Sequence, residues 1–232
     1  MTNRTGTVVI GGGQAGLNTS RALQMSDHDH VVLERGRIGE TWRTQRWQSF
    51  RLNTPSWASM LLGVEDAPGD RDGFMDVDQL CEMMQTFASH YELPISENTE
   101  VRRVTRSDGT FLVETADGDW HADNVVVCSG SQNVPKLPGL AHELSGVTQL
   151  HAAQYRDPDA LADGALVVVG SAQSGCQISE ELAGSGRTTF LCSGNVASVP
   201  RRHRGRDIAA WMLETGVAHT PVSALEDPSA RY

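Results

Sequence analysis

The chain has 232 residues, of which 39% are hydrophobic and 21% charged, a composition typical of globular proteins and not of disordered or fibrous ones. Acidic residues outnumber basic ones by 29 to 19, so the formal net charge is −10 and no nucleic-acid partner is expected, because phosphate needs a positive surface. No stretch approaches the apolar length of a membrane-spanning helix, and the N-terminus lacks a signal-peptide core. These features predict a protein without membrane association.

The four cysteines do not form a Cys-x-x-Cys pair, and most lie among apolar or strand-like residues. Buried thiols in a reducing cytoplasm are therefore predicted, and no metal site is expected. The lack of a closely spaced redox pair also argues against a flavoprotein disulfide reductase. The cysteines are Cys81, Cys128, Cys176 and Cys192.

The N-terminal part has the pattern of a strand–helix–strand unit. Val8–Ile10 is an apolar run that ends at a glycine cluster, as in a buried parallel strand. A helix is expected from about Gln14 to Met25, followed by a second parallel strand at Val31–Leu33.

The turn of this unit matches the dinucleotide fingerprint G-x-G-x-x-G. Gly11 allows the tight turn, Gly13 lets the backbone approach a diphosphate, and Gly16 lets the helix pack on its strand. Glu34 ends the next strand, where a carboxylate accepts hydrogen bonds from ribose hydroxyls and disfavours a 2′-phosphate. The alternative is that any tight strand–helix turn favours glycine.

The middle of the chain begins with an irregular stretch at residues 36–75, of a length that is normally functional or mobile. Asp76 or Asp78 can cap a helix that runs from about Val77 to Tyr91. Alternating residues then predict an antiparallel insertion with Asp-Gly turns after Ser107 and Ala116. Its strands are Thr99–Thr105, Thr110–Thr115 and Asp119–Ala122, and a separate buried strand follows at Val125–Cys128.

A second strand–helix–strand unit follows two prolines, Pro135 and Pro138, which mark a crossing between domains. Its elements are a strand at residues 165–169, a helix at 173–183 and a strand at 188–192. The predicted fold is therefore α/β, with two Rossmann-like dinucleotide-binding domains and an antiparallel β insertion. We place a flavin domain at residues 1–136 and a partial nicotinamide domain, which is incomplete, at residues 137–232.

The second turn has an alanine, Ala172, at the position of the middle glycine. The strand after it ends at Ser193 without an acid, and a basic cluster containing Arg201 and Arg202 follows. This pattern predicts NADPH, with Ser193 and Arg201 or Arg202 on the 2′-phosphate; the alternative is that the arginines belong to a solvated surface loop. The whole turn is Gly170, Ser171, Ala172, Gln173, Ser174 and Gly175.

The order of these segments resembles the flavin-containing monooxygenase group, from Val8 to about Asp207. The resemblance rests on Glu34-Arg35-Gly36, Gly39-Glu40-Thr41-Trp42, Arg46–Pro55, Ser129-Gly130 and Gln149–Arg156. It implies that FAD lies along the first domain and that His151 and Tyr155 help to hold the two domains together. The implied FAD contacts are Gly11, Gly13, Gln14, Ala15, Gly16, Glu34, Arg35, Thr41, Trp42, Arg46, Val101, Ser129 and Gly130.

The resemblance also implies a catalytic role for Asn53, which matches an asparagine that in some members contacts the flavin near its oxygen-reacting carbon. The alternative role for Asn53 is to cap a turn before Pro55. The implied activity is NADPH-dependent monooxygenation, in which a flavin hydroperoxide transfers one oxygen atom from O2 to a small organic substrate. A flavin reductase or oxidase that makes peroxide, and a non-catalytic FAD-binding half of a split enzyme, are the competing interpretations.

The chain is shorter than members of this group, which complete both domains with further strands. We therefore expect association, either with itself or with a chain that supplies the C-terminal part.

Overall fold

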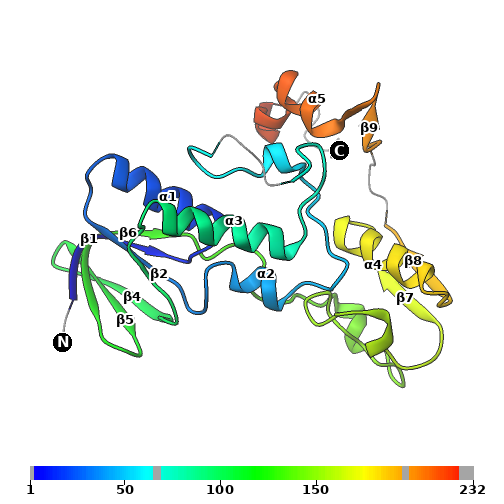
Figure 1. Cartoon of the computed structure of the whole chain (residues 1–232). Helices are drawn as coiled ribbons and strands as arrows, with labels where there is room; N and C mark the ends of the chain where they lie inside the picture. Colours follow the sequence, from blue (N-terminus) through cyan, green and yellow to red (C-terminus); the bar gives the residue numbers. More distant parts are fainter. Residues whose placement is uncertain (1–2, 65–68, 195–198, 225–232) are drawn as a thin grey trace.

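The computed structural model describes residues 3–64, 69–194 and 199–224, which form three parts in Figure 1. The first part is a six-stranded sheet with its helices. The second is a smaller strand–helix–strand unit, and the third is a C-terminal hairpin with a short helix. Within these ranges, no helix is long and apolar enough to cross a membrane.

The large sheet has the strand order β3-β2-β1-β6-β5-β4. The strands β3, β2, β1 and β6 run parallel to one another. On the far edge of β6, the strands β5 and β4 continue the sheet with antiparallel pairing. The sheet therefore contains both the parallel core and the antiparallel insertion predicted from the sequence. The strands are β1 (Asn3–Ile10), β2 (His30–Leu33), β3 (Ile95–Ser96), β4 (Val101–Ser107), β5 (Thr110–Thr115) and β6 (Trp120–Val127).

One prediction about this sheet was wrong, because the two strands expected at residues 119–122 and 125–128 are the single strand β6. Its first half pairs antiparallel with β5, and its whole length pairs parallel with β1 from Asn3 to Ile10. The polar pair Asp123 and Asn124 suggested a break. Pairing with β1 on the other edge carries the strand through these two exposed residues.

Helices α1 (Gln14–Met25) and α3 (Val77–His90) lie beside one another over the sheet (Figure 1). Leu17 of α1 is fully buried in one cluster with apolar side chains of α3. Of the two predicted caps of α3, Asp76 is the one that the structure shows, since it accepts a hydrogen bond from Gln79 N at 2.8 Å while its own N–H donates to the Gln79 side chain. This capping box defines where α3 begins.

The irregular stretch between β2 and α3 contributes more to the core than its polar composition suggested. It contains the short helix α2 (Glu40–Thr44) and the 3-10 turn η1 (Ser56–Ala58). Trp47 and Phe50 are buried in it, with ring centroids 5.1 Å apart.

The second unit consists of β7 (Leu166–Val169), α4 (Gln173–Gly184) and β8 (Thr189–Cys192), as predicted, with β7 and β8 parallel. Leu166 and Val168 pack toward α4, whereas the opposite face of this two-stranded sheet is open. Val167, Val169 and Phe190 are 61%, 66% and 56% exposed there.

The prediction of buried thiols was correct only for Cys81, whose pKa is raised by burial. Cys128 is half-buried, and Cys176 and Cys192 are exposed. Cys176 lies in the first turn of α4, and Cys192 ends β8, whose open face no other described strand covers. Apolar sequence neighbours therefore did not guarantee burial.

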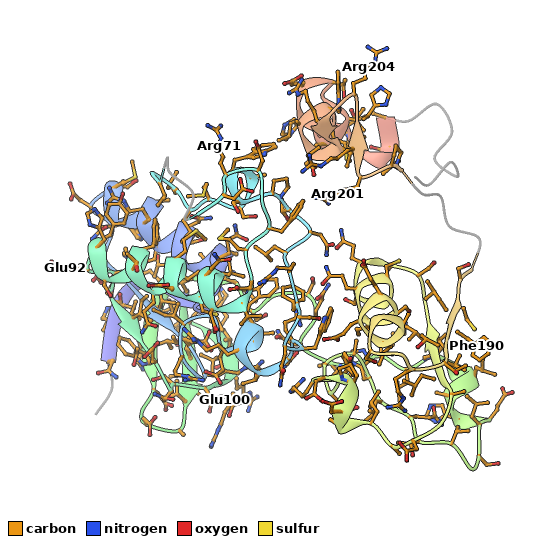
Figure 2. The ribbon with its side chains drawn as sticks, turned by 45° about the vertical axis from the view of Figure 1, so that its right-hand side comes forward. Arg71, Glu92, Glu100, Phe190, Arg201 and Arg204 are labelled. Carbon is orange, nitrogen blue, oxygen red and sulfur yellow. The ribbon has the colours of Figure 1, made fainter. Side chains whose placement is uncertain are left out.

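The C-terminal part contains the predicted arginine run within a short hairpin, β9 (Arg202–His203) and β10 (Arg206–Asp207). Helix α5 (Ile208–Glu214) follows, capped by the Asp207 side chain, which accepts from Ala209 N at 2.8 Å. This hairpin lies apart from β8 in both views (Figures 1 and 2).

Candidate functional site

The first glycine turn is built so that two of its glycines cannot be replaced without moving the backbone. Gly11 has φ of +111°, a conformation that side chains rarely adopt. A Cβ on Gly16 would lie 1.8 Å from the Gly11 carbonyl oxygen. Both glycines therefore have the structural roles predicted from the sequence.

Gly13 differs, because a Cβ built there meets nothing within 4 Å. It is the N-cap of α1 in an extended conformation, and no described side chain caps this helix. Free N–H groups at a helix start attract anions, and α1 has no acidic residue in its first turn to satisfy that need. The space at Gly13, and N–H groups of Gly13, Gln14 and Ala15 that have no partner among the described residues, therefore fit a diphosphate.

Glu34 is buried at the end of β2, beside this turn. Its carboxylate accepts hydrogen bonds from Gly12 N at 2.6 Å and from Gly36 N at 2.9 Å. Two backbone donors fix the carboxylate, and each oxygen retains a lone pair that can accept from a ribose hydroxyl.

The other predicted flavin contacts lie on segments around this turn. Two of them, Arg46 and Trp42, stack on each other. The Arg46 guanidinium carbon lies 4.7 Å from the centroid of the half-buried Trp42 ring, and Arg46 also donates to Gln132 at 3.4 Å. Burial lowers the pKa of Arg46 from its ordinary value. Thr41 is half-buried beside Trp42 in α2.

The remaining contacts lie at strand ends. Val101 begins β4 and packs against the sheet core, and Arg35 is exposed 3.5 Å from Asn133. Ser129 and Gly130 follow β6, where the Asn133 side chain donates to the Ser129 carbonyl. These contacts do not test the predicted flavin roles, which stay predictions.

The second turn repeats the geometry of the first. Gly170 has φ of +103°, and a Cβ on Gly175 would lie 1.8 Å from the Gly170 carbonyl oxygen. Ala172 occupies the N-cap of α4 in the extended conformation of Gly13, again with no described side chain as a cap. Gln173 and Ser174 open the helix, and the Cys176 thiol faces the Ser171 carbonyl at 3.2 Å.

The residues predicted for the 2′-phosphate do not lie together. Ser193 is exposed after β8, whereas Arg201 is on the C-terminal hairpin, facing the segment that contains Arg71 in Figure 2. Arg201 pairs with Asp207 at 2.9 Å and lies 4.3 Å above the Phe74 ring, and Arg202 is exposed on β9.

A cleft of about 470 Å³ lies where the first domain meets α4 and the hairpin. Asn53 lines it, and the Asn53 Oδ1 accepts a hydrogen bond from Gln177 of α4 at 3.1 Å. The preceding residue, Leu52, also lines a smaller hollow with Gln14 at the start of α1. The Asn53 segment therefore lies between the first helix start and the interdomain cleft.

Tyr155 joins the two domains, as the resemblance implied. It is buried against Trp47, with ring centroids 6.3 Å apart, and donates to Glu181 of α4 at 2.7 Å. Desolvation, and then the hydrogen bond to Glu181, raise the pKa of the Tyr155 hydroxyl far above its ordinary value. Within the described residues, the hydrogen bonds of His151 are local: its ring accepts from Ala153 N at 3.1 Å, and its backbone bonds Gln154.

Sequence reasoning missed Gln177 and Phe74. Their partners, Asn53 and Arg201, are more than a hundred residues away along the chain. A glutamine in a helix and a phenylalanine before a capping aspartate carry no local signal of such contacts.

Two glycine turns, each followed by a helix without a side-chain cap, define a protein of the dinucleotide-binding α/β class. The sequence profile of the pyridine nucleotide-disulphide oxidoreductase family matches residues 8–215, so the chain belongs to that family. The chain is 32% identical over 215 residues to the uncharacterized oxidoreductase CzcO of Bacillus subtilis. It is 34% identical over 220 residues to an uncharacterized CzcO-like oxidoreductase of Geobacillus kaustophilus.

Among solved structures, a mutant of the flavin monooxygenase from Stenotrophomonas maltophilia aligns with a TM-score of 0.79 at 25% identity, over 93% of this chain and 64% of that one. The two CzcO matches cover 92% and 94% of this chain but 62% of each relative. The chain thus spans less than two thirds of their length. These matches confirm the α/β fold and the resemblance to flavin monooxygenases.

Proposed function

We propose that this chain supplies the FAD site and part of the NADPH site of a flavin-dependent monooxygenase. The observation that carries the proposal is the position of residues 52–54. Leu52 and Thr54 line the hollow at the start of α1, and Leu52 and Asn53 line the cleft against α4. A flavin whose diphosphate is held at Gly13 would reach this segment, and a nicotinamide held on the α4 side would meet it there.

In this proposal, the residues of the chain bind and orient the two dinucleotides. The N–H groups at the starts of α1 and α4 bind the two diphosphates, and Glu34 accepts from the flavin ribose. Ser193, Arg201 and Arg202 are proposed for the 2′-phosphate, which requires the hairpin to move toward Ser193 and Arg201 to exchange its pairing with Asp207 for the ligand. Asn53 donates a hydrogen bond toward the reacting edge of the flavin.

The bound flavin supplies the redox chemistry, namely hydride acceptance and activation of O2. In the overall reaction, the substrate, O2, NADPH and one proton are converted to the oxygenated substrate, NADP⁺ and water. The description of the family supports the pyridine nucleotide, and the Stenotrophomonas enzyme supports the flavin and the monooxygenase class.

The test is the visible absorption spectrum of the purified chain, with added FAD, before and after anaerobic NADPH. We expect an oxidised-flavin spectrum that NADPH bleaches faster than NADH does. A chain that binds no FAD would overturn the proposal for this chain, and a bound flavin that NADPH leaves oxidised would overturn its nicotinamide half. Peroxide released per NADPH consumed then separates oxygenation from simple oxidase turnover.

A further inference from the structure

The side chain of Gln177, in α4, makes three hydrogen bonds to the segment that carries Asn53. Its Oε1 accepts from Arg51 N at 3.3 Å, and its Nε2 donates to the Arg51 carbonyl at 2.9 Å. The same Nε2 donates to Asn53 Oδ1 at 3.1 Å. Gln177 therefore pairs with the Arg51 backbone as a neighbouring strand would.

This arrangement sets which way both amides face. The oxygen and nitrogen of a side-chain amide are distinguished by their partners, and a backbone N–H can only donate while a carbonyl can only accept. Arg51 offers one of each, so the Gln177 oxygen must face the N–H and its nitrogen the carbonyl. That nitrogen is a donor, and Asn53 must therefore present Oδ1 to it.

The consequence concerns the other half of the Asn53 amide. With Oδ1 bonded to Gln177, the Nδ2 group has no hydrogen-bond partner among the described residues, and Asn53 lines the cleft. A donor left free in the cleft can bond an acceptor on a ligand, whereas a flipped amide would present an oxygen there instead.

We propose that Gln177 is a positioning residue that holds Asn53 in the orientation in which its NH2 group is free to donate to a cofactor or substrate in the cleft. The orientation depends only on the contacts above, whereas its use in oxygenation rests on the proposed function. Because Gln177 lies on the helix that begins at the second glycine turn, it also links that turn to Asn53.

The test of orientation uses the chain without cofactor. Gln177→Glu keeps the size and the acceptor for Arg51 N but removes the donor to Asn53 and to the Arg51 carbonyl. We expect the Asn53 amide to flip and donate to the new carboxylate, so that exchange of its Nδ2 protons with water, measured by NMR, slows at least fivefold. Gln177→Met removes all three bonds without adding a charge, and exchange should stay within twofold of the wild type.

Unchanged Asn53 exchange in folded Gln177→Glu would overturn the inference, whether or not the chain binds FAD. If Gln177→Glu does not fold, the orientation of Asn53 is tested with Gln177→Met instead. In that variant the Asn53 amide should lose its single orientation, seen as averaged side-chain shifts, and one fixed set of wild-type shifts would overturn the inference.

The second arm uses the FAD-loaded chain. Asn53→Ala and Gln177→Glu should each slow flavin reduction by NADPH about tenfold when the chain is saturated with FAD. The double variant should be no slower than either single one, because Gln177 acts through Asn53. If the rate reductions of the two single variants multiply in the double variant, Gln177 does not act through Asn53. If the chain binds no FAD, the proposed function is wrong, and the NMR measurement alone decides the orientation of Asn53.

Discussion

At the scale of single residues, the two glycine turns separate structural from binding roles. Gly16 and Gly175 stand in the same relation to Gly11 and Gly170, with a Cβ position 1.8 Å from a carbonyl oxygen. Gly13 has open space instead, which agrees with the expectation from the sequence that the backbone there lets a diphosphate approach. Backbone contact requires glycine at positions 16 and 175, whereas the open space at Gly13 leaves room for the predicted diphosphate.

This difference predicts opposite results for two alanine substitutions. Gly16→Ala should destabilise the chain by about 3 kcal/mol, although an ordinary glycine-to-alanine change inside a helix stabilises it. Gly13→Ala should leave the urea midpoint unchanged and weaken FAD binding about tenfold, because the methyl group stands in the path of the diphosphate. Urea unfolding and FAD titration measure both, and equal loss of stability in the two variants would contradict the assignment.

A second prediction at this scale concerns the arginines proposed for the 2′-phosphate. Replacing Arg201 and Arg202 with alanine should raise the Kd for NADP⁺ about tenfold and leave the Kd for NAD⁺ within twofold, because only NADP⁺ carries the 2′-phosphate. Arg204, which points outward in Figure 2, is the matched control. An equal rise in the Kd for NADP⁺ and for NAD⁺ would show that the two arginines stabilise the hairpin and do not bind the 2′-phosphate.

At the scale of elements, helix starts distinguish structure from site. Asp76 caps α3 and Asp207 caps α5, whereas α1 and α4 begin without a described side-chain cap. Asp76 and Asp207 each accept a hydrogen bond from one N–H of the first turn, whereas the short helix α2, like α1 and α4, begins without a described side-chain cap. We expect the starts of the two helices that follow glycine turns to bind an anion, because helix N-termini attract negative charge.

The cap of α3 gives a pH-dependent prediction. The hydrogen bond from Gln79 N and the ion pair with Arg51, at 2.7 Å, hold the pKa of Asp76 below its ordinary value of 3.8. A lowered folded pKa means that the stabilisation is complete above the unfolded pKa and is lost as the pH falls through the folded one.

Asp76→Ala should therefore cost about 1 kcal/mol at pH 7, and this difference from the wild type should shrink at acid pH. Asp76→Asn, which can cap without ionising, should lose only the pH-dependent part of the difference. Urea unfolding at several pH values measures the effect. A cost of Asp76→Ala that stays constant down to pH 2 would argue against the charged cap.

At the scale of the whole molecule, the two glycine-turn units differ in how completely they are covered. The first belongs to a sheet of six strands, and the second to a sheet of two whose outer face is open. Val167, Val169 and Phe190 form that face. Exposed apolar sheet surface of this kind favours association.

We predict that the chain self-associates through this face. Phe190→Thr should weaken association at least tenfold, measured by sedimentation equilibrium, without lowering the thermal midpoint, because the ring contributes little to the folded core. Val134→Thr is the control, since Val134 is 84% exposed but lies outside the β7–β8 sheet. Equal loss of association in both variants would contradict the prediction.

The sequence alone determined the two strand–helix–strand units, their glycine turns, the acid at Glu34 and a helix cap at Asp76 or Asp78. All of these depend on residues within one turn or one periodic segment, where sterics and local hydrogen bonds decide the outcome. Local pattern also explains the error at β6. The polar pair Asp123–Asn124 looks like an interruption when only the one strand is considered.

Only the tertiary structure decided the continuity of β6 along β1, the exposure of Cys176 and Cys192, and the contact of Gln177 with Asn53. It also separated Arg201 from Ser193, which the sequence had grouped together. The physical reason is that pairing, burial and hydrogen bonding across domains depend on residues that folding brings together from distant parts of the chain. No periodicity in either segment records the presence of the other.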